Sequence, residues 1–80
     1  MNVPQPLSSL SPGSHGVVAE IRVPATHRGR LLEMGLLVGT PVELVRFAPL
    51  GDPVEIKLRG YHLSLRRHEA DLILIRPAEA

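Results

Sequence analysis

Cysteine and tryptophan are absent from the 80-residue chain, and Phe47 and Tyr61 are its single phenylalanine and tyrosine. Without cysteine the chain has no disulfide, no thiolate ligand for zinc and no thiol nucleophile. With so few aromatics it cannot line the groove that binds proline-rich peptides, nor the stacking platforms that bind single-stranded nucleic acid. These absences exclude several classes of binding module and enzyme.

A strong net charge and long apolar runs are also absent. Nine Lys and Arg face eight Asp and Glu, for a formal charge of +1. Dedicated DNA-binding domains are usually far more basic. No apolar run approaches the roughly 20 residues that span a bilayer, and residues 1–6 have neither the basic nor the apolar part of a signal peptide. We therefore expect a protein of the cytoplasm without a nucleic-acid partner.

Short apolar alternations between proline and glycine turns make up most of the chain. They predict one domain over residues 7–76, with a flexible N-terminus at 1–6 and a flexible tail at 77–80. The expected strands are 16–23, 42–47, 54–59, 62–65 and 72–76. The expected helix is 26–34, with helical turns at 7–10 and 66–71. Five strands and one short helix favour a small barrel over a sandwich, which needs about seven strands.

Two of these elements carry more detailed expectations. In the strand 16–23, alternation places Val17, Ala19, Ile21 and Val23 on the core face. In the helix, Thr26 is the expected N-cap and Gly35 the expected stop. Three cationic side chains near the helix start oppose its dipole, which indicates either a functional site or a solvated basic turn. These three are His27, Arg28 and Arg30.

Residues 48–53 form a strong turn signal, with two prolines, a glycine and Asp52. The loop either recognises a partner or only shapes a hairpin. Leu50 stands at its tip, where an apolar side chain gains meaning as part of a patch. Phe47 and Leu37 are candidates to complete that patch.

The densest basic spot is Arg66 and Arg67, followed by His68. It is suited either to acidic groups on a partner or to a solvated helical turn. His62, His68 and Glu69 are the candidate metal ligands, for an adventitious zinc or other divalent metal ion on the surface, within one molecule or between two. No pair of them has the i, i+4 spacing of a helical metal site, so we expect no closed structural site.

Catalytic groups are present without a catalytic spacing. Ser64, His62 and a carboxylate at Asp52 or Asp71 are available, but nothing in their order brings them together. The segment at residues 13–16 lacks the lysine and spacing of a phosphate loop. We therefore expect no enzyme activity.

Four segments carry a resemblance to a known family. They are Leu-Leu-Glu-Met-Gly-Leu at 31–36, Val-Gly-Thr-Pro-Val-Glu-Leu-Val-Arg at 38–46, Ala-Pro-Leu-Gly-Asp-Pro-Val-Glu-Ile at 48–56, and Arg-Gly-Tyr-His-Leu-Ser-Leu-Arg-Arg at 59–67. In this order they resemble the FeoA family of bacterial ferrous iron transport, from about Leu7 to Ile75. A related domain forms the C-terminal part of repressors of the diphtheria-toxin-repressor type.

The resemblance implies an SH3-like β-barrel of the cytoplasm that acts without catalysis and requires no cofactor. It further implies a partner, the GTPase-like cytosolic region of the FeoB permease. Within that expectation we assign partner binding to Phe47, Leu50, Asp52, Arg66 and Arg67. The alternative is a metal-responsive regulator or a homodimer bridged by metal at surface histidines.

Overall fold

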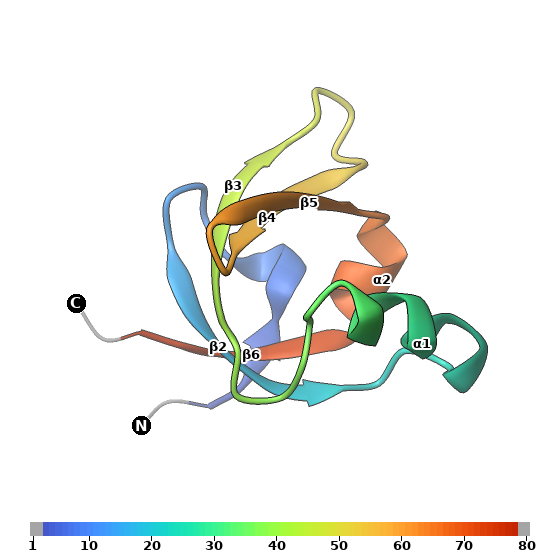
Figure 1. Ribbon diagram of the computed structural model, residues 1–80. Coiled ribbons are helices and arrows are strands. Elements are labelled where there is room, and N and C mark those ends of the chain that lie inside the picture. The colour runs from blue at the N-terminus through green and yellow to red at the C-terminus, as the bar shows by residue number, and fades with distance from the viewer. Residues whose placement is uncertain (1–2, 79–80) are drawn as a thin grey trace.

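The computed structural model describes residues 3–78 (Figure 1). Six strands, two α-helices and one 3-10 turn follow one another in these residues. The strands are β1 Gln5–Pro6, β2 His15–Ile21, β3 Pro41–Phe47, β4 Val54–Leu58, β5 Tyr61–Leu65 and β6 Ile73–Pro77. The helical elements are η1 Leu7–Ser9, α1 Ala25–Glu33 and α2 Arg67–Asp71. No helix within these residues is long and apolar enough to cross a membrane.

The strands form one antiparallel sheet in the order β1-β6-β2-β3-β4-β5, which curls around the core (Figure 1). This confirms the expected small, mainly β, SH3-like fold. The strand count differs by one, because Gln5 and Pro6 pair with Ile75 and Leu74 as the edge strand β1. Proline is tolerated there because an edge strand needs no second row of backbone donors. The flexible ends were expected at 1–6 and 77–80, but residues 5–6 lie in β1 and residue 77 ends β6. Residues 1–2 and 79–80 lie outside the described residues.

The core is aliphatic and comes mainly from the period-two alternation of the strands. Strand β4 has the pattern buried, half-buried, buried, exposed, buried, as its sequence predicts. The core residues are Leu7, Leu10, Val18, Val23, Leu31, Leu36, Val42, Leu44, Val54, Ile56, Leu58, Leu65, Ala70, Ile73 and Ile75. Half-buried Phe47 packs against this cluster from the end of β3.

The expected facing of β2 is wrong at its start. Val18 is buried, whereas Val17 is 41% exposed. The pairing of β2 with β6 shifts between Val18 and Glu20, which is a β-bulge. A bulge inserts one residue and changes which side chains face inward, so a single alternation cannot describe the whole strand. Gly16 precedes the bulge, and a Cβ there would lie 2.5 Å from the Arg76 carbonyl oxygen.

Helix α1 begins one residue before its expected start. Pro24, not Thr26, is the N-cap residue, and it makes no side-chain capping bond. The cations near the helix start have specific partners. Arg28 donates from Nη2 to the carbonyl oxygens of Ile21 and Val23, at 2.9 and 3.1 Å. These bonds tie α1 to the end of β2.

A two-residue turn at Arg59 and Gly60 joins β4 to β5. Both residues have positive φ, +49° and +85°. Two such residues are the signature of a type I′ hairpin turn, whose twist matches that of the strands. Leu58 and Tyr61 flank the turn and lie opposite each other. The turn therefore determines which backbone groups of β5 face β4.

Candidate functional site

The loop at residues 48–53, hereafter the 48–53 loop, projects from the sheet between β3 and β4 (Figure 1). Its first half is a hydrogen-bonded turn in which the Gly51 N–H donates to the Ala48 carbonyl at 2.7 Å. Proline at the second position and glycine at the fourth suit this turn. Leu50 occupies the third position and is 96% exposed. The turn thus holds an apolar side chain in solvent.

The first residue of α2, Arg67, braces this loop. Its guanidinium carbon lies 5.4 Å from the centroid of the Phe47 ring, a cation–π contact. Its backbone N–H donates to the Asp52 carboxylate at 3.2 Å, and its Nη1 lies 3.5 Å from the Gly51 carbonyl oxygen. Asp52 thereby satisfies one of the free N–H groups at the start of the helix. The loop and the start of α2 form one surface.

The structure brings together most of the residues assigned to partner binding. Arg67 contacts both Phe47 and Asp52, and Leu50 lies on the loop that these contacts hold in place. Arg66 comes just before Arg67 and lines a neighbouring cleft. Leu37 does not join the patch. It precedes β3 whereas Leu50 follows it, and seven strand residues separate the two ends by roughly 20 Å.

A cleft of about 390 Å³ lies between the open side of β5 and the helices. We call it the β5 cleft. Its lining residues are Arg30, Pro53, Ser64, Leu65, Arg66 and Glu69. It therefore connects α1, the 48–53 loop, β5 and α2.

Glu69 is the one buried charged side chain among residues 3–78. Arg30 donates to its Oε2 at 2.5 Å, and the backbone N–H of Arg66 donates to its Oε1 at 3.3 Å. His27 Nδ1 lies 3.9 Å from Oε2. Burial raises the pKa of the Glu69 carboxyl, but the hydrogen bonds from Arg30 and Arg66 outweigh burial and hold that pKa below its ordinary value. The ionised carboxylate thus joins α1 to α2.

The proposed metal ligands are not placed as a surface site. The expectation for Glu69 is wrong, because its side chain is only 3% exposed and is bound by Arg30. His62 Nδ1 lies 2.6 Å from Glu55 Oε2. The hydrogen bond from Arg46, followed by the contact with His62, lowers the pKa of Glu55. Within residues 3–78 no three His, Asp or Glu side chains are placed to share a metal ion. Zinc held between two copies stays a prediction.

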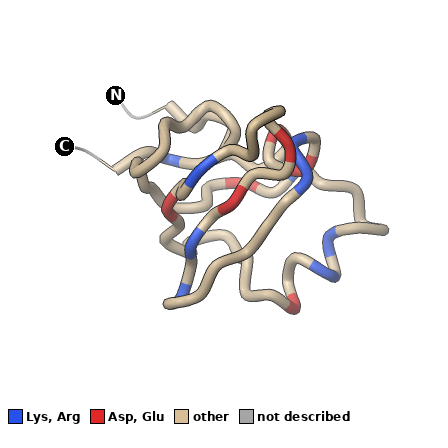
Figure 2. Tube along the Cα trace, turned by 90° about the horizontal axis from the view of Figure 1, so that it is seen from above, with Lys and Arg blue, Asp and Glu red and all other residues tan. Residues whose placement is uncertain are grey.

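Charged residues of both signs are distributed along the trace (Figure 2). Several pair locally, as do Arg22 with Glu20 and Arg46 with Glu55, with N–O distances of 2.7 and 2.8 Å. Such pairs offset the charge of these two arginines locally. The absence of a nucleic-acid partner stays a prediction from net charge.

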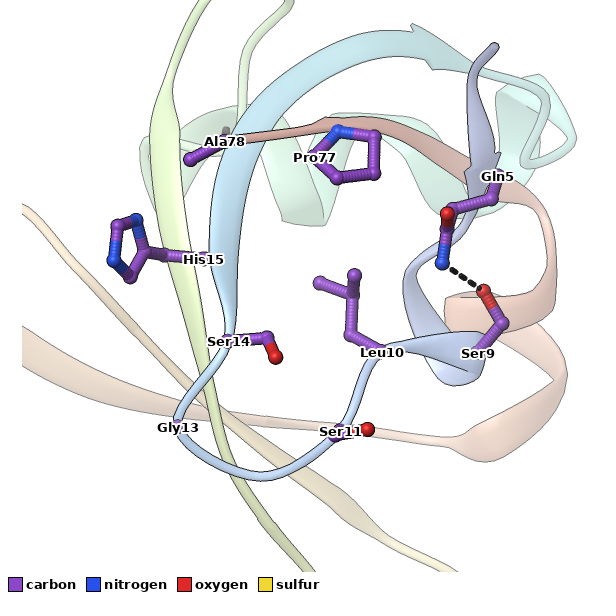
Figure 3. A pocket seen from close by; sticks show the side chains of 9 residues that line it. All are labelled: Gln5, Ser9, Leu10, Ser11, Gly13, Ser14, His15, Pro77 and Ala78. Atoms are coloured by element: carbon purple, nitrogen blue, oxygen red, sulfur yellow. Dashed lines mark hydrogen bonds between the residues drawn. The ribbon is translucent and has the colours of Figure 1, made fainter. Parts of the chain in front are cut away.

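A second cleft, of about 400 Å³, lies where the two ends of the domain meet (Figure 3). Its lining residues are Gln5, Ser9, Leu10, Ser11, Gly13, Ser14, His15, Pro77 and Ala78. Gln5 donates to Ser9 at 2.8 Å, and Figure 3 shows the His15 ring pointing away from these two residues. No Asp, Glu, Lys or Arg side chain of the described residues lines it. Its polar lining comes from Gln5, Ser9, Ser11, Ser14 and His15, and we assign no site to it.

The sequence pattern singled out Arg30 only together with His27 and Arg28, as a functional site or a solvated basic turn. The partner of Arg30, Glu69, lies 39 residues away, and such a pairing has no local spacing to reveal it. The available signal was the unusual set of cations in α1. Arg30 now links the helix to the β5 cleft.

The chain matches the FeoA domain family over residues 5–77. It is 39% identical over 64 residues to the Fe(2+) transport protein A/Fe(2+) transporter FeoB fusion protein of Porphyromonas gingivalis, a match that covers 80% of this chain but 8% of that protein. The NMR structure of the FeoA-like protein from Clostridium acetobutylicum is 34% identical, with a TM-score of 0.87, and the match covers 100% of this chain and 93% of that one. Stenotrophomonas maltophilia FeoA complexed with zinc is 27% identical, with a TM-score of 0.75 and coverage of 89% and 88%.

A manganese-dependent transcriptional repressor shares the fold alone. It is 14% identical, with a TM-score of 0.88, and the match covers 98% of this chain and 38% of the repressor. This likeness shows that the expected shared fold extends to a domain of that repressor. The FeoA match extends from β1 to the end of β6, across the 48–53 loop and the β5 cleft. The chain therefore belongs to the FeoA family.

Proposed function

We propose that the chain is a non-enzymatic accessory protein of ferrous iron transport in the cytoplasm. In this proposal it binds the GTPase-like cytosolic region of a FeoB-type permease through the 48–53 loop. Family membership and the fusion of the two proteins in the Porphyromonas gingivalis relative support this role. Fusion places two domains in one chain, which favours partners that act together.

The exposure of Leu50 carries the proposal. At 96% it is the most exposed large apolar side chain among the described residues, and it stands on a loop held by Arg67, Asp52 and Phe47. Interfaces obtain much of their affinity from a few side chains that become buried at their centre. A loop already held in place loses little conformational entropy on binding. Leu50 is therefore suited to be an apolar anchor.

The experiment is a calorimetric titration of the chain with the purified cytosolic domain of the permease, without nucleotide and with GDP or a GTP analogue. The test variant is Leu50→Asp. We expect it to lose at least about 2 kcal/mol of binding, the cost typical of a central apolar anchor. Its stability should change by less than about 0.5 kcal/mol, because Leu50 makes few contacts.

Val3→Asp is the matched control, since Val3 is 70% exposed on another part of the chain. It should bind as the wild type does. Absence of wild-type binding in every nucleotide state would refute the proposed partner. Equal binding by wild type and Leu50→Asp would refute the assignment of the 48–53 loop.

A further inference from the structure

Strand β5 is an edge of the sheet, and its outer side has no partner strand among residues 3–78. Leu58 and Tyr61 flank a two-residue hairpin turn, so they form a hydrogen-bonded pair. Such pairs alternate with pairs whose N–H and C=O groups point away from each other. The alternation makes Lys57–His62 and Glu55–Ser64 pairs of the second kind. His62 and Ser64 therefore direct their backbone groups outward.

These outward groups have no other backbone partner in the described part of the chain. Natural proteins usually cover or blunt such an edge, because it is a template for another strand. Here the β5 cleft lies beside it, with Ser64 and Leu65 on one wall and Arg30 on another. The edge is thus both unpaired and accessible.

The charges around the edge indicate what kind of strand would occupy it. Arg59 precedes β5, and Arg66 and Arg67 follow it, all three exposed. A second copy of the chain, paired antiparallel about Leu63, would place its Arg59 opposite Arg67. Like charges directly opposite each other destabilise a strand pair. Acidic side chains would instead pair with these arginines.

We infer that β5 binds its partner by strand addition, with an extended acidic segment pairing along His62 and Ser64 and a carboxylate of that segment reaching Arg66 in the β5 cleft. Main-chain hydrogen bonds supply affinity in this mode, and the side chains supply selection. The inference rests on the proposed function, and the partner segment belongs to the permease's cytosolic region. It adds a second contact next to the 48–53 loop, because Pro53 of that loop also lines the β5 cleft.

Amide hydrogen exchange of the chain, alone and with the purified cytosolic domain of the permease, tests the inference directly. In the free chain the amides of His62 and Ser64 should exchange quickly, whereas those of Leu63 and Leu65 should be protected by β4. In the complex, exchange at His62 and Ser64 should slow about tenfold or more, because new main-chain bonds form there. The amide of Gln5, on the opposite edge strand, is the internal control.

Two variant pairs give an independent readout by titration. Ser64→Pro removes only the outward N–H, and proline is tolerated on an edge strand, whereas Ser64→Ala keeps that N–H. We expect Ser64→Pro to weaken binding about tenfold, which is the worth of one hydrogen bond, and Ser64→Ala to bind as the wild type. Arg66→Gln should weaken binding about fivefold by removing a charge contact. Its matched control, Arg76→Gln on β6, should have no effect.

The outcomes separate the two claims. Wild-type binding with unchanged exchange at His62 and Ser64 overturns strand addition and leaves the permease as partner. Equal binding by Ser64→Pro and Ser64→Ala overturns it as well. Absence of wild-type binding overturns the proposed function, and strand addition with it. If Ser64→Pro fails to fold, the exchange data on the wild type still decide.

Discussion

The ion pair between buried Glu69 and half-exposed Arg30 is the long-range polar contact that we expect to contribute most to stability. Its contribution can be measured with Arg30→Gln, Glu69→Gln and the double variant. The Glu69 side chain is 3% exposed and that of Arg30 is 48% exposed, with 2.5 Å between Nη2 and Oε2. Arg30→Gln would leave the buried Glu69 carboxylate without its cationic partner, so that weaker hydrogen bonds would have to offset its lost hydration.

The expected coupling lies between two limits. Removing one partner of a fully buried pair costs about 3–5 kcal/mol, and an exposed pair contributes about 0–1 kcal/mol. Because solvent screens Arg30 in part, we expect a coupling of about 1–2 kcal/mol at pH 7. In a domain of this size each 1 kcal/mol lowers the Tm by about 4–8 °C. The single variant Arg30→Gln should therefore melt about 5–15 °C below the wild type.

The pKa of Glu69 determines how the contribution of this ion pair to stability changes with pH. The pKa of Glu69 in the folded chain lies below its unfolded value of 4.5. The pair therefore contributes fully above the unfolded value, and its contribution falls as the pH drops through the folded pKa. His27 Nδ1, 3.9 Å from the carboxylate, also faces the group, so the cycle should be repeated in a His27→Gln background.

The assay is urea unfolding of the four proteins at pH 7 and at about pH 3, with the coupling energy taken from the cycle. Coupling should be clear at pH 7 and should shrink at low pH. A coupling energy below about 0.3 kcal/mol at pH 7, within the usual error of additivity, would refute the reasoning. So would a coupling that grows on acidification.

Two further substitutions test the backbone. Gly16→Ala should lower the free energy of unfolding by about 1–3 kcal/mol in thermal melts, because the new Cβ would lie 2.5 Å from a carbonyl oxygen of β6; an unchanged Tm would contradict that close approach. Arg59→Asn should raise the free energy of unfolding by about 0.5 kcal/mol, and with it the urea midpoint, since asparagine is favoured at positive φ in a type I′ turn. A lower midpoint would mean that the Arg59 side chain outweighs its strained backbone.

Local patterns predicted the fold where one residue's role depends on its near neighbours. The alternation of Val54, Ile56 and Leu58 follows from sequence, and so does the end of α1 near Gly35, which has a φ of +91°. The bulge in β2 does not, because it lies in the register of β2 against β6, a strand more than 50 residues later in the sequence. Strand β1 was not predicted, because a strand of two residues is too short to show an alternation.

The candidate surface was predictable in its parts and not in its assembly. The turn residues around Leu50 predicted that it lies at a loop tip. The contacts of Arg67 with Phe47 and Asp52 were not predictable, because they require that β5 bring the start of α2 next to the loop. Glu69 was mistaken for a surface ligand, because its neighbours in sequence are polar whereas its neighbours in space are Arg30 and the core. Composition alone does not reveal which charged residue the fold will bury.

The pairing of β1 with β6 brings the two ends of the domain side by side, with Gln5 opposite Ile75. A domain whose ends are adjacent can be inserted into a longer polypeptide, or circularly permuted, with little disturbance of its interior. The 48–53 loop projects from another part of the sheet (Figure 1), so a tether at either end would leave it uncovered. A tethered copy would meet its binding site at an effective concentration in the millimolar range. Even a weak interaction through Leu50 would then be largely occupied.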